Sequence, residues 1–292
     1  EHRKEVFNNA DCVIGNLETS LSHSWPYATE QLNIDGMPNC NGPKQYLGAL
    51  KFAGFDALVL ANNHCCDAGV QGIIETTQAV EEYGFPYTGL FREKDAQRFV
   101  ILDVKGIKVG LLSYAEFYNS KDKAVREAGC EYMINTYSKE RIAEDIAAAR
   151  AAGAELIVAY NHWGAEHTHQ PTPKVVTHAQ EMADAGVDII IGSHSHAVQP
   201  VVWLTAADGR QVLCAYSMGN FVSSMGRSTA NDTFIAEIGI ESEKYHPCRV
   251  FPQLKGYWYV VVPTNVTIVN SIIPQLKAAE ERITAIVNPE GR

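Results

Sequence analysis

The stretch from Leu156 to Pro200 constrains the fold more than any other part of the chain. An apolar, β-prone run at 156–160 leads into a polar loop, an amphipathic helix at 173–185 that stops at Gly186, and a second apolar run at 187–191. Short apolar runs of this kind are typical of strands buried on both faces. Two parallel strands joined by a helix form a right-handed crossover, so both strands end at one edge of a sheet. The stretch therefore predicts an α/β protein.

Three histidines follow these two predicted strands. His162 comes after the first strand, and His194 and His196 come after the second. In an extended segment residues two apart face the same side, so His194 and His196 are expected to reach into one cavity. A single buried histidine is more often a hydrogen-bonded core residue, but three at one edge indicate a metal site. Imidazoles together with oxygen ligands suit zinc, iron or manganese better than calcium or magnesium.

The rest of the chain alternates strands and helices before turning mostly to strands. Strands at 10–15 and 55–61 lead into Asn16-Leu17-Glu18 and Asn62-Asn63-His64, which brings more polar side chains to strand ends. The remaining predicted elements are helices at 46–53, 71–83, 139–152 and 274–286, a short helix near Ala124, and strands at 87–90, 98–103, 107–114, 201–204, 211–216, 233–240 and 257–262. Residues 1–9 read as the end of a helix and 22–44 as a long surface loop. We expect one domain over 1–292 with a two-sheet core.

Several polar residues also have ordinary structural interpretations. Asp67 is placed to cap the helix expected from about Val70, where a carboxylate favours the helix dipole. His167 and His169 are interpreted as surface residues of a loop, and His178 as a helix residue without a role in the site. Glu18 taken alone would be a solvated loop carboxylate.

Composition excludes some classes of function. The net charge of −10 and a pI near 5.5 argue against a nucleic-acid surface, and no apolar stretch approaches the roughly 20 residues of a membrane span. The seven cysteines lack the paired spacing of a zinc knuckle or disulfide framework, and slightly favour a reducing compartment. The vicinal pair Cys65-Cys66 is a poorer ligand candidate than the imidazoles. The compartment stays open: the cell envelope if a leader or anchor precedes this chain, and otherwise the cytoplasm.

Five motifs in order resemble the bacterial capsule-synthesis CapA (poly-γ-glutamate) family of the calcineurin-like metallophosphoesterase superfamily. They are Asn16-Leu17-Glu18-Thr19, Asn62-Asn63-His64 with Asp67 and Gly69, His162-Trp163-Gly164 with Glu166, Gly192-Ser193-His194-Ser195-His196 with Gln199-Pro200, and Tyr216-Ser217-Met218-Gly219-Asn220-Phe221. The resemblance covers roughly residues 5–225. Residues 226–292 are expected to add closing strands and a C-terminal helix.

The resemblance implies a four-layer α/β/β/α sandwich with two divalent metals, Mn, Fe or Zn, at the strand ends. By motif match Glu18 bridges the metals, Asn63, His162 and His194 bind one of them, and His196 binds the other. His64 then protonates the leaving group or steadies the transition-state charge. The surrounding cavity residues for orienting ligands or substrate are Asn16, Asp67, Glu166, Gln199 and Asn220.

One motif of the family is not matched. The family opens with a strand ending in Gly-Asp, whereas only about fifteen residues precede Asn16 here and none is expected to form that strand. The first strand is therefore expected to be missing from this chain or to lie upstream, and the first metal position to be weak or empty.

Two functions follow as hypotheses. The first is a metal-dependent hydrolase of a phosphoester or related bond in capsule or poly-γ-glutamate metabolism, acting on a small molecule or an anionic polymer. The alternative is a non-catalytic accessory or polymer-binding protein of capsule assembly. Either hypothesis allows capsule-assembly proteins as partners.

Overall fold

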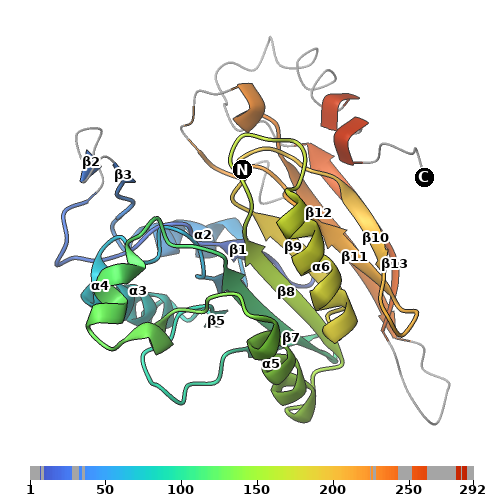
Figure 1. The fold of residues 1–292 in the computed structure, drawn as a ribbon, viewed down its shortest axis with the longest axis horizontal. Coiled ribbons are helices and arrows are strands. Elements are labelled where there is room, and N and C mark those ends of the chain that lie inside the picture. Colours follow the sequence, from blue (N-terminus) through green and yellow to red (C-terminus); the bar gives the residue numbers. More distant parts are fainter. Residues whose placement is uncertain are drawn as a thin grey trace. The chain divides into compact units, whose positions relative to one another are not determined.

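The computed structural model describes residues 7, 10–27, 33–34, 37–223, 225, 228–242, 252–261, 281–283 and 285–287. The chain divides into two compact units, Glu1–Ala154 and Glu155–Arg292. Both units contain strands and helices (Figure 1), so the predicted α/β class is confirmed. The single domain and the four-layer order stay predictions.

The first unit contains a parallel sheet and a hairpin. Strands β1 (Ile14–Asn16), β4 (Ala57–Val59) and β5 (Tyr87–Thr88) form the sheet in the order β1-β4-β5. The hairpin consists of β6 (Val100–Val104) and β7 (Ile107–Ala115), and β7 contacts both β5 and α5. The helices are α2 (Tyr46–Ala53), α3 (Gly69–Glu82), α4 (Asp122–Glu127) and α5 (Lys139–Ala151), with a 3₁₀ turn η1 (Glu131–Met133).

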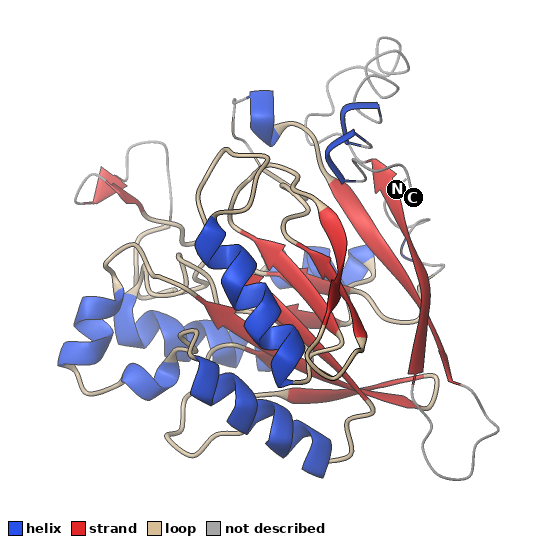
Figure 2. Cartoon of the chain, turned by 45° about the vertical axis from the view of Figure 1, so that its right-hand side comes forward, coloured by secondary structure: helices blue, strands red, loops and turns tan. Residues whose placement is uncertain are grey.

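The second unit contains the crossover predicted from residues 156–200. Its strands run in the order β10-β11-β9-β8, with β8 (Leu156–His162), β9 (Ile189–Ser193), β10 (Val201–Thr205) and β11 (Gln211–Ala215). Strand β9 is parallel to both β8 and β11, whereas β10 is antiparallel to β11. Every residue of β8 and β9 is buried, as their apolar runs predict. Helix α6 (Pro173–Ala185) packs against β9 and β10 (Figures 1 and 2).

Both ends of α6 follow from local sequence. The Thr172 side chain accepts a hydrogen bond from the backbone N–H of Val175, and Pro173 occupies the first turn. At the other end Gly186 adopts a left-handed φ of 113°, and its N–H reaches the carbonyls of Met182 and Ala183. These caps place His162 and His194, at the two ends of the crossover, at one edge of the sheet.

Other predicted elements differ in extent. The strand expected over 10–15 is confined to β1, and the loop expected over 22–44 includes a short antiparallel pair, β2 (Asn33–Ile34) and β3 (Met37–Pro38). The late strands are β12 (Phe234–Ser242) and β13 (Pro252–Val261), which pair antiparallel, and η2 (Ser228–Ala230) precedes them. Of the terminal helix, residues 281–283 and 285–287 are helical, and of the segment 1–9 Phe7 is helical. The rest of both predictions lies outside the described residues.

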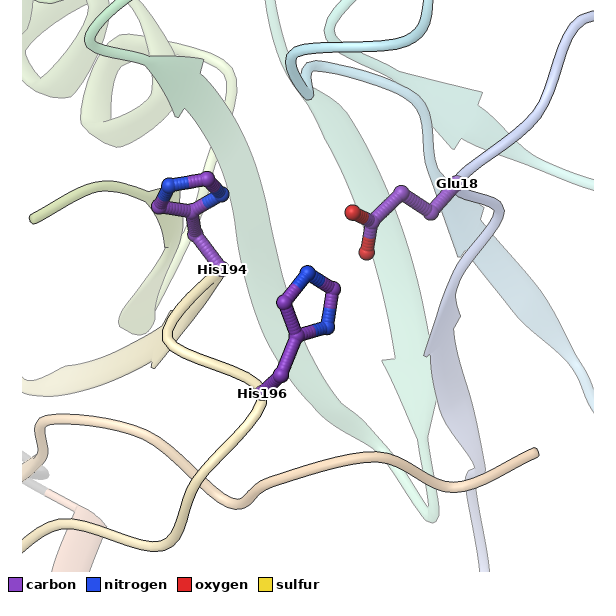
Figure 3. A group of neighbouring side chains, drawn as sticks. All are labelled: Glu18, His194 and His196. Atoms are coloured by element: carbon purple, nitrogen blue, oxygen red, sulfur yellow. The ribbon is translucent and has the colours of Figure 1, made fainter. Parts of the chain in front are cut away.

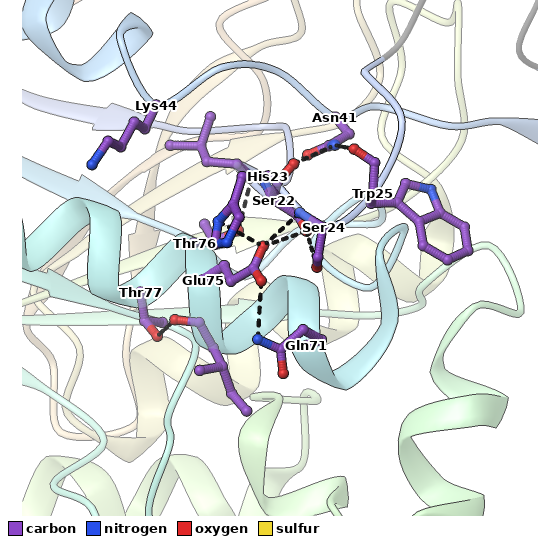
Figure 4. A network of polar contacts seen from close by, with 12 residues as sticks. Ser22, His23, Ser24, Trp25, Asn41, Lys44, Gln71, Glu75, Thr76 and Thr77 are labelled. Atoms are coloured by element: carbon purple, nitrogen blue, oxygen red, sulfur yellow. Dashed lines mark hydrogen bonds and ion pairs between the residues drawn. The ribbon is translucent and has the colours of Figure 1, made fainter.

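Glu75 on α3 fastens the loop that follows β1 (Figure 4). Its Oε2 accepts hydrogen bonds from Ser22 Oγ at 2.6 Å and from Ser24 N at 3.2 Å, and its Oε1 accepts one from Gln71 Nε2 at 3.0 Å. The side chain is only 4% exposed. Burial raises the pKa of Glu75, but these hydrogen bonds to the charged form outweigh burial and hold the pKa at about 2.

This low pKa predicts a loss of stability in acid that depends on Glu75. The contribution is complete above the ordinary glutamate pKa of 4.5 and is lost as pH falls towards about 2, because the unfolded chain takes up the proton first. Urea unfolding of Glu75→Gln and the unaltered chain should therefore give stabilities that converge by roughly 3 kcal/mol between pH 5 and pH 2. The control is Glu82→Gln on the same helix, whose carboxylate is exposed. A gap that stays constant with pH would refute the prediction.

Candidate metal centre

A network of amides ties together the polar residues at the ends of β1 and β4. The buried Asn62 side chain donates to Asn16 Oδ1 at 3.2 Å and to the Leu17 carbonyl at 2.9 Å, and accepts from the His64 N–H at 3.1 Å. Asn16 Nδ2 in turn donates to Glu18 Oε2 at 3.2 Å. The structure thus brings Asn16, Glu18 and His64 into one network. Sequence reasoning assigned no role to Asn62, although the doubled asparagine before His64 is a usable signal.

Asn63 lies beside this network with a polar atom that needs a partner. Its side chain is 1% exposed, and its Oδ1 accepts no hydrogen bond from the residues that the structure describes. A buried acceptor left in this state costs about 1–3 kcal/mol. An amide oxygen of this kind suits a divalent cation, as the sequence predicted for Asn63.

His64 is paired with Asp67. Their Nδ1 and Oδ2 atoms are 2.8 Å apart, and the Asp67 side chain is fully buried. Burial lowers the pKa of His64, but the hydrogen bonds to Asp67 and Cys40 outweigh it and raise the pKa to about 10. The prediction that Asp67 caps the next helix is wrong: Ala68 is the cap residue of α3 and makes no side-chain capping bond. The pairing with His64 and with the Cys40 N–H takes both lone-pair directions of Oδ2 instead.

In the second unit, Ser193 fixes the proton position of His162. The serine hydroxyl donates to the Asn161 carbonyl at 3.2 Å, so its oxygen accepts from His162 Nδ1, which is 3.1 Å away. His162 Nδ1 therefore carries the hydrogen, and the lone pair is on Nε2. A second-shell hydrogen bond of this kind is how proteins orient a histidine that ligates a metal.

His194 lies directly against that lone pair. Its Nδ1 is 3.1 Å from His162 Nε2, and both side chains are buried. Two imidazole nitrogens bound to one ion at 2.0–2.1 Å lie roughly 3.0–3.4 Å apart for angles of about 90–110°. The observed spacing of 3.1 Å lies within this range.

The route by which His194 and His196 come together differs from the prediction. Their ring centroids are 5.9 Å apart, and Figure 3 shows both imidazoles on the loop after β9. The segment is not extended, because both histidines have a positive φ, 92° and 55°. Left-handed backbone is uncommon outside glycine and is enriched at functional sites. Glu18, also labelled in Figure 3, belongs to the first unit.

His196 also has a defined proton position. Asn220 Oδ1 lies 2.9 Å from His196 Nδ1, and an amide oxygen can only accept, so Nδ1 donates and the lone pair is on Nε2. Glu166 Oε1 is 4.0 Å from that Nε2, and the His167 ring is stacked over His196 with centroids 5.7 Å apart. The interpretation of His167 as a surface residue is wrong, since its side chain is 17% exposed and lies 3.4 Å from Glu166. In the sequence, the position of His167 directly after Glu166 was the one feature that could have indicated its place beside His196.

Gln199 stabilises the loop after β8, which carries Glu166 and His167. Its buried side chain donates to the carbonyls of Thr168 and Gln170, at 3.0 and 3.2 Å. His169 also anchors the loop, through Nδ1 2.9 Å from the Val198 carbonyl. Both residues position the segment that carries Glu166 and His167.

Taken unit by unit, these residues fit a divalent cation. The first unit offers the buried Asn63 oxygen, and the second offers two imidazole nitrogens, His162 Nε2 and His194 Nδ1, at ligand spacing together with the lone pair on His196 Nε2. Nitrogen and oxygen donors of this kind suit zinc, iron or manganese.

No helix among the described residues is long and apolar enough to cross a membrane.

Known proteins are similar in sequence to most of this chain. The capsule biosynthesis protein CapA of Bacillus anthracis is 29% identical over 239 residues, which is 81% of this chain and 56% of that protein. The PGA biosynthesis protein CapA of Bacillus subtilis is 26% identical over 245 residues, or 81% of this chain and 60% of that protein. The chain thus spans somewhat more than half the length of these relatives.

The chain is also similar to a solved structure and matches a family model. The crystal structure of the calcineurin-like phosphoesterase YfkN from Bacillus subtilis matches this chain with a TM-score of 0.46 and 17% sequence identity. The match covers 81% of this chain and 73% of the YfkN chain. The family model described as bacterial capsule synthesis protein PGA_cap matches residues 1–225, which include every motif described above. The chain therefore belongs to the PGA_cap family of bacterial capsule synthesis proteins.

Proposed function

We propose that this chain is a metal-dependent hydrolase of a phosphoester or related bond, in the metabolism of capsule or poly-γ-glutamate. Glu18, Asn63, His162, His194 and His196 are the proposed ligands of two divalent cations. The observation that carries the proposal is the 3.1 Å spacing of His162 Nε2 and His194 Nδ1, with the His162 proton held on the opposite nitrogen. Bound cations would supply an activated water and neutralise developing negative charge.

His64 is the proposed proton donor to the leaving oxygen. Its Nδ1 is engaged by Asp67 at 2.8 Å, which orients the ring and leaves Nε2 to face the substrate. Asn62 holds the backbone of His64 in place, and Asn16 orients the Glu18 carboxylate. Glu166 and Asn220 set the surroundings of His196 and are proposed to orient the substrate.

The test is hydrolysis of a generic aryl phosphate by the metal-loaded chain. His64→Ala should reduce turnover of the manganese-loaded chain by about 10²-fold or more while the manganese content stays unchanged, because His64 is the proton donor and not one of the five proposed ligands of the two cations. The control is His23→Ala, which removes a side chain that is 82% exposed in the same unit. Absence of turnover in the manganese- or zinc-loaded chain would overturn the hydrolase proposal, and so would full activity of His64→Ala.

A non-catalytic role in capsule assembly is the second candidate. It is favoured by the names of the two relatives, which refer to capsule and PGA biosynthesis and specify no reaction. Under this role the same cations would bind an anionic polymer, and capsule-assembly proteins would be the partners. A chain that binds poly-γ-glutamate only in the presence of metal, and hydrolyses no phosphoester, would establish it.

A further inference from the structure

A second group of metal-ligating side chains lies wholly within the first unit. Cys40, His64 and Asp67 each offer one ligand atom, and these three atoms lie within 4.8 Å of one another. The group combines a thiol, an imidazole and a carboxylate. It differs in kind from the donor set of histidine nitrogens and oxygens proposed above, because it includes sulfur.

The backbone holds Cys40 in place beside His64. The Cys40 N–H donates to Asp67 Oδ2 at 2.5 Å, and the Cys40 carbonyl accepts from the Ser20 N–H at 3.0 Å. Ser20 Oγ donates in turn to the His64 carbonyl at 3.3 Å. Residues 20 to 44 positions apart in the sequence are therefore held together by these three hydrogen bonds, which fix the backbone of Cys40 relative to Ser20 and Asp67.

Asp67 has an oxygen available for a cation. Its side chain is 0% exposed, and Oδ2 already takes hydrogen bonds from Cys40 and His64. The other oxygen, Oδ1, has no hydrogen-bond partner among the residues that the structure describes. A buried carboxylate oxygen without a partner is costly, and a bound cation would satisfy it.

The anionic ligands of the site favour a cation, although the dipole of helix α3 opposes one. Helix α3 begins at Gly69, two residues after Asp67, so its positive end disfavours a cation. A carboxylate or thiolate in direct contact with the ion contributes a larger favourable Coulomb energy than the end of a helix costs. Two such anionic ligands outweigh the dipole.

We propose that Cys40, His64 and Asp67 bind a borderline-soft divalent cation such as zinc, with a fourth position open to water. Thiolate, imidazole and carboxylate are the ligands that zinc takes in proteins, at 2.0–2.3 Å. Ligand atoms of such a site lie roughly 3–4 Å apart, and the three atoms observed here lie within 4.8 Å of one another, so they need to approach by only about 1 Å or less. A cation bound here would use His64 as a ligand and would therefore prevent the proton donation proposed above. The proposal of this metal site does not depend on the chain being a hydrolase.

Cadmium binding to the metal-free, reduced chain tests the proposal. Cadmium shares the preference of zinc for thiolate, and a cadmium–thiolate bond gives a near-ultraviolet charge-transfer band that imidazole and oxygen ligands do not. The unaltered chain should show this band at one equivalent. Cys40→Ser should lose the band, and His64→Gln should keep it but weaken cadmium binding by more than about tenfold, the least expected for loss of a direct ligand.

The control is Cys130→Ser, another half-buried cysteine of the same unit, which should keep both the band and the affinity. A band that persists in Cys40→Ser would place cadmium on other thiols, such as Cys65 or Cys66, and would overturn the proposal. Cadmium binding without any band would also overturn it, and would leave the histidine ligands of the proposed hydrolase unaffected.

Discussion

His194→Ala is expected to lower metal-dependent hydrolysis by about 10³-fold, the upper range for loss of one charge-stabilising group. His194 Nδ1 lies 3.1 Å from His162 Nε2, and the side chain is buried, so alanine would leave a cavity where the proposed ligand was. The variant should also bind fewer equivalents of manganese or zinc. Turnover of an aryl phosphate and metal content after gel filtration are the two measurements.

His178→Ala is the matched control for this variant. His178 lies on α6 in the same unit and is only partly buried, and its removal should change neither turnover nor metal content. If His194→Ala retained the metal content and the turnover of the unaltered chain, His194 would not be a ligand. Loss of turnover with full metal content would instead assign it a role in orienting substrate.

Gly192→Ala should destabilise the second unit by more than about 3 kcal/mol, the upper range for overpacking a core. A Cβ at this position would lie 2.0 Å from the Tyr216 carbonyl oxygen and 2.4 Å from Trp163 Nε1. These two groups are hydrogen-bonded to each other at 3.1 Å and are both buried, so neither can move away freely. Strand β9 or β11 would have to shift, and the loop that carries His194 would shift with it.

The comparison is Gly239→Ala in β12, where an added Cβ meets no atom within 4 Å. Thermal unfolding should show a large drop in midpoint for Gly192→Ala and almost none for Gly239→Ala. Equal midpoints for the two variants would mean that the backbone at Gly192 tolerates a side chain, contrary to the observed contacts.

Strand and helix positions in the crossover were predictable because burial and capping act locally. The helix predicted over 173–185 has those bounds, because Thr172 caps its start and Gly186 ends it. The second strand was predicted two residues early, at 187–191 instead of Ile189–Ser193. The reason is that Val187 is apolar and buried like the strand that follows it, but its N–H bonds to the Met182 carbonyl near the end of α6 and so belongs to the turn. Asp188 bonds to Ile157 of β8 through its N–H, just before β9 begins.

The candidate site was predictable as a set of residues but not as a geometry. The motifs identified His162, His194 and His196, yet the left-handed φ at His194 and His196 has no signal in sequence, because those residues are not glycine. Likewise nothing local distinguishes Asp67 as a partner of His64 from Asp67 as a helix cap. That choice depends on the Cys40 N–H, which arrives from 27 residues away. A long-range hydrogen bond decided the role of Asp67.

The hydroxyl of Ser193 has a consequence for which ions this protein prefers. The bond to Ser193 already fixes the orientation and the tautomer of the His162 ring in the folded chain. The ring would therefore lose little further conformational freedom on binding an ion. A stiff pair of donors tolerates only ions whose radius suits their separation. Ser193→Ala should therefore broaden the range of ions accepted before it weakens the affinity for any one of them.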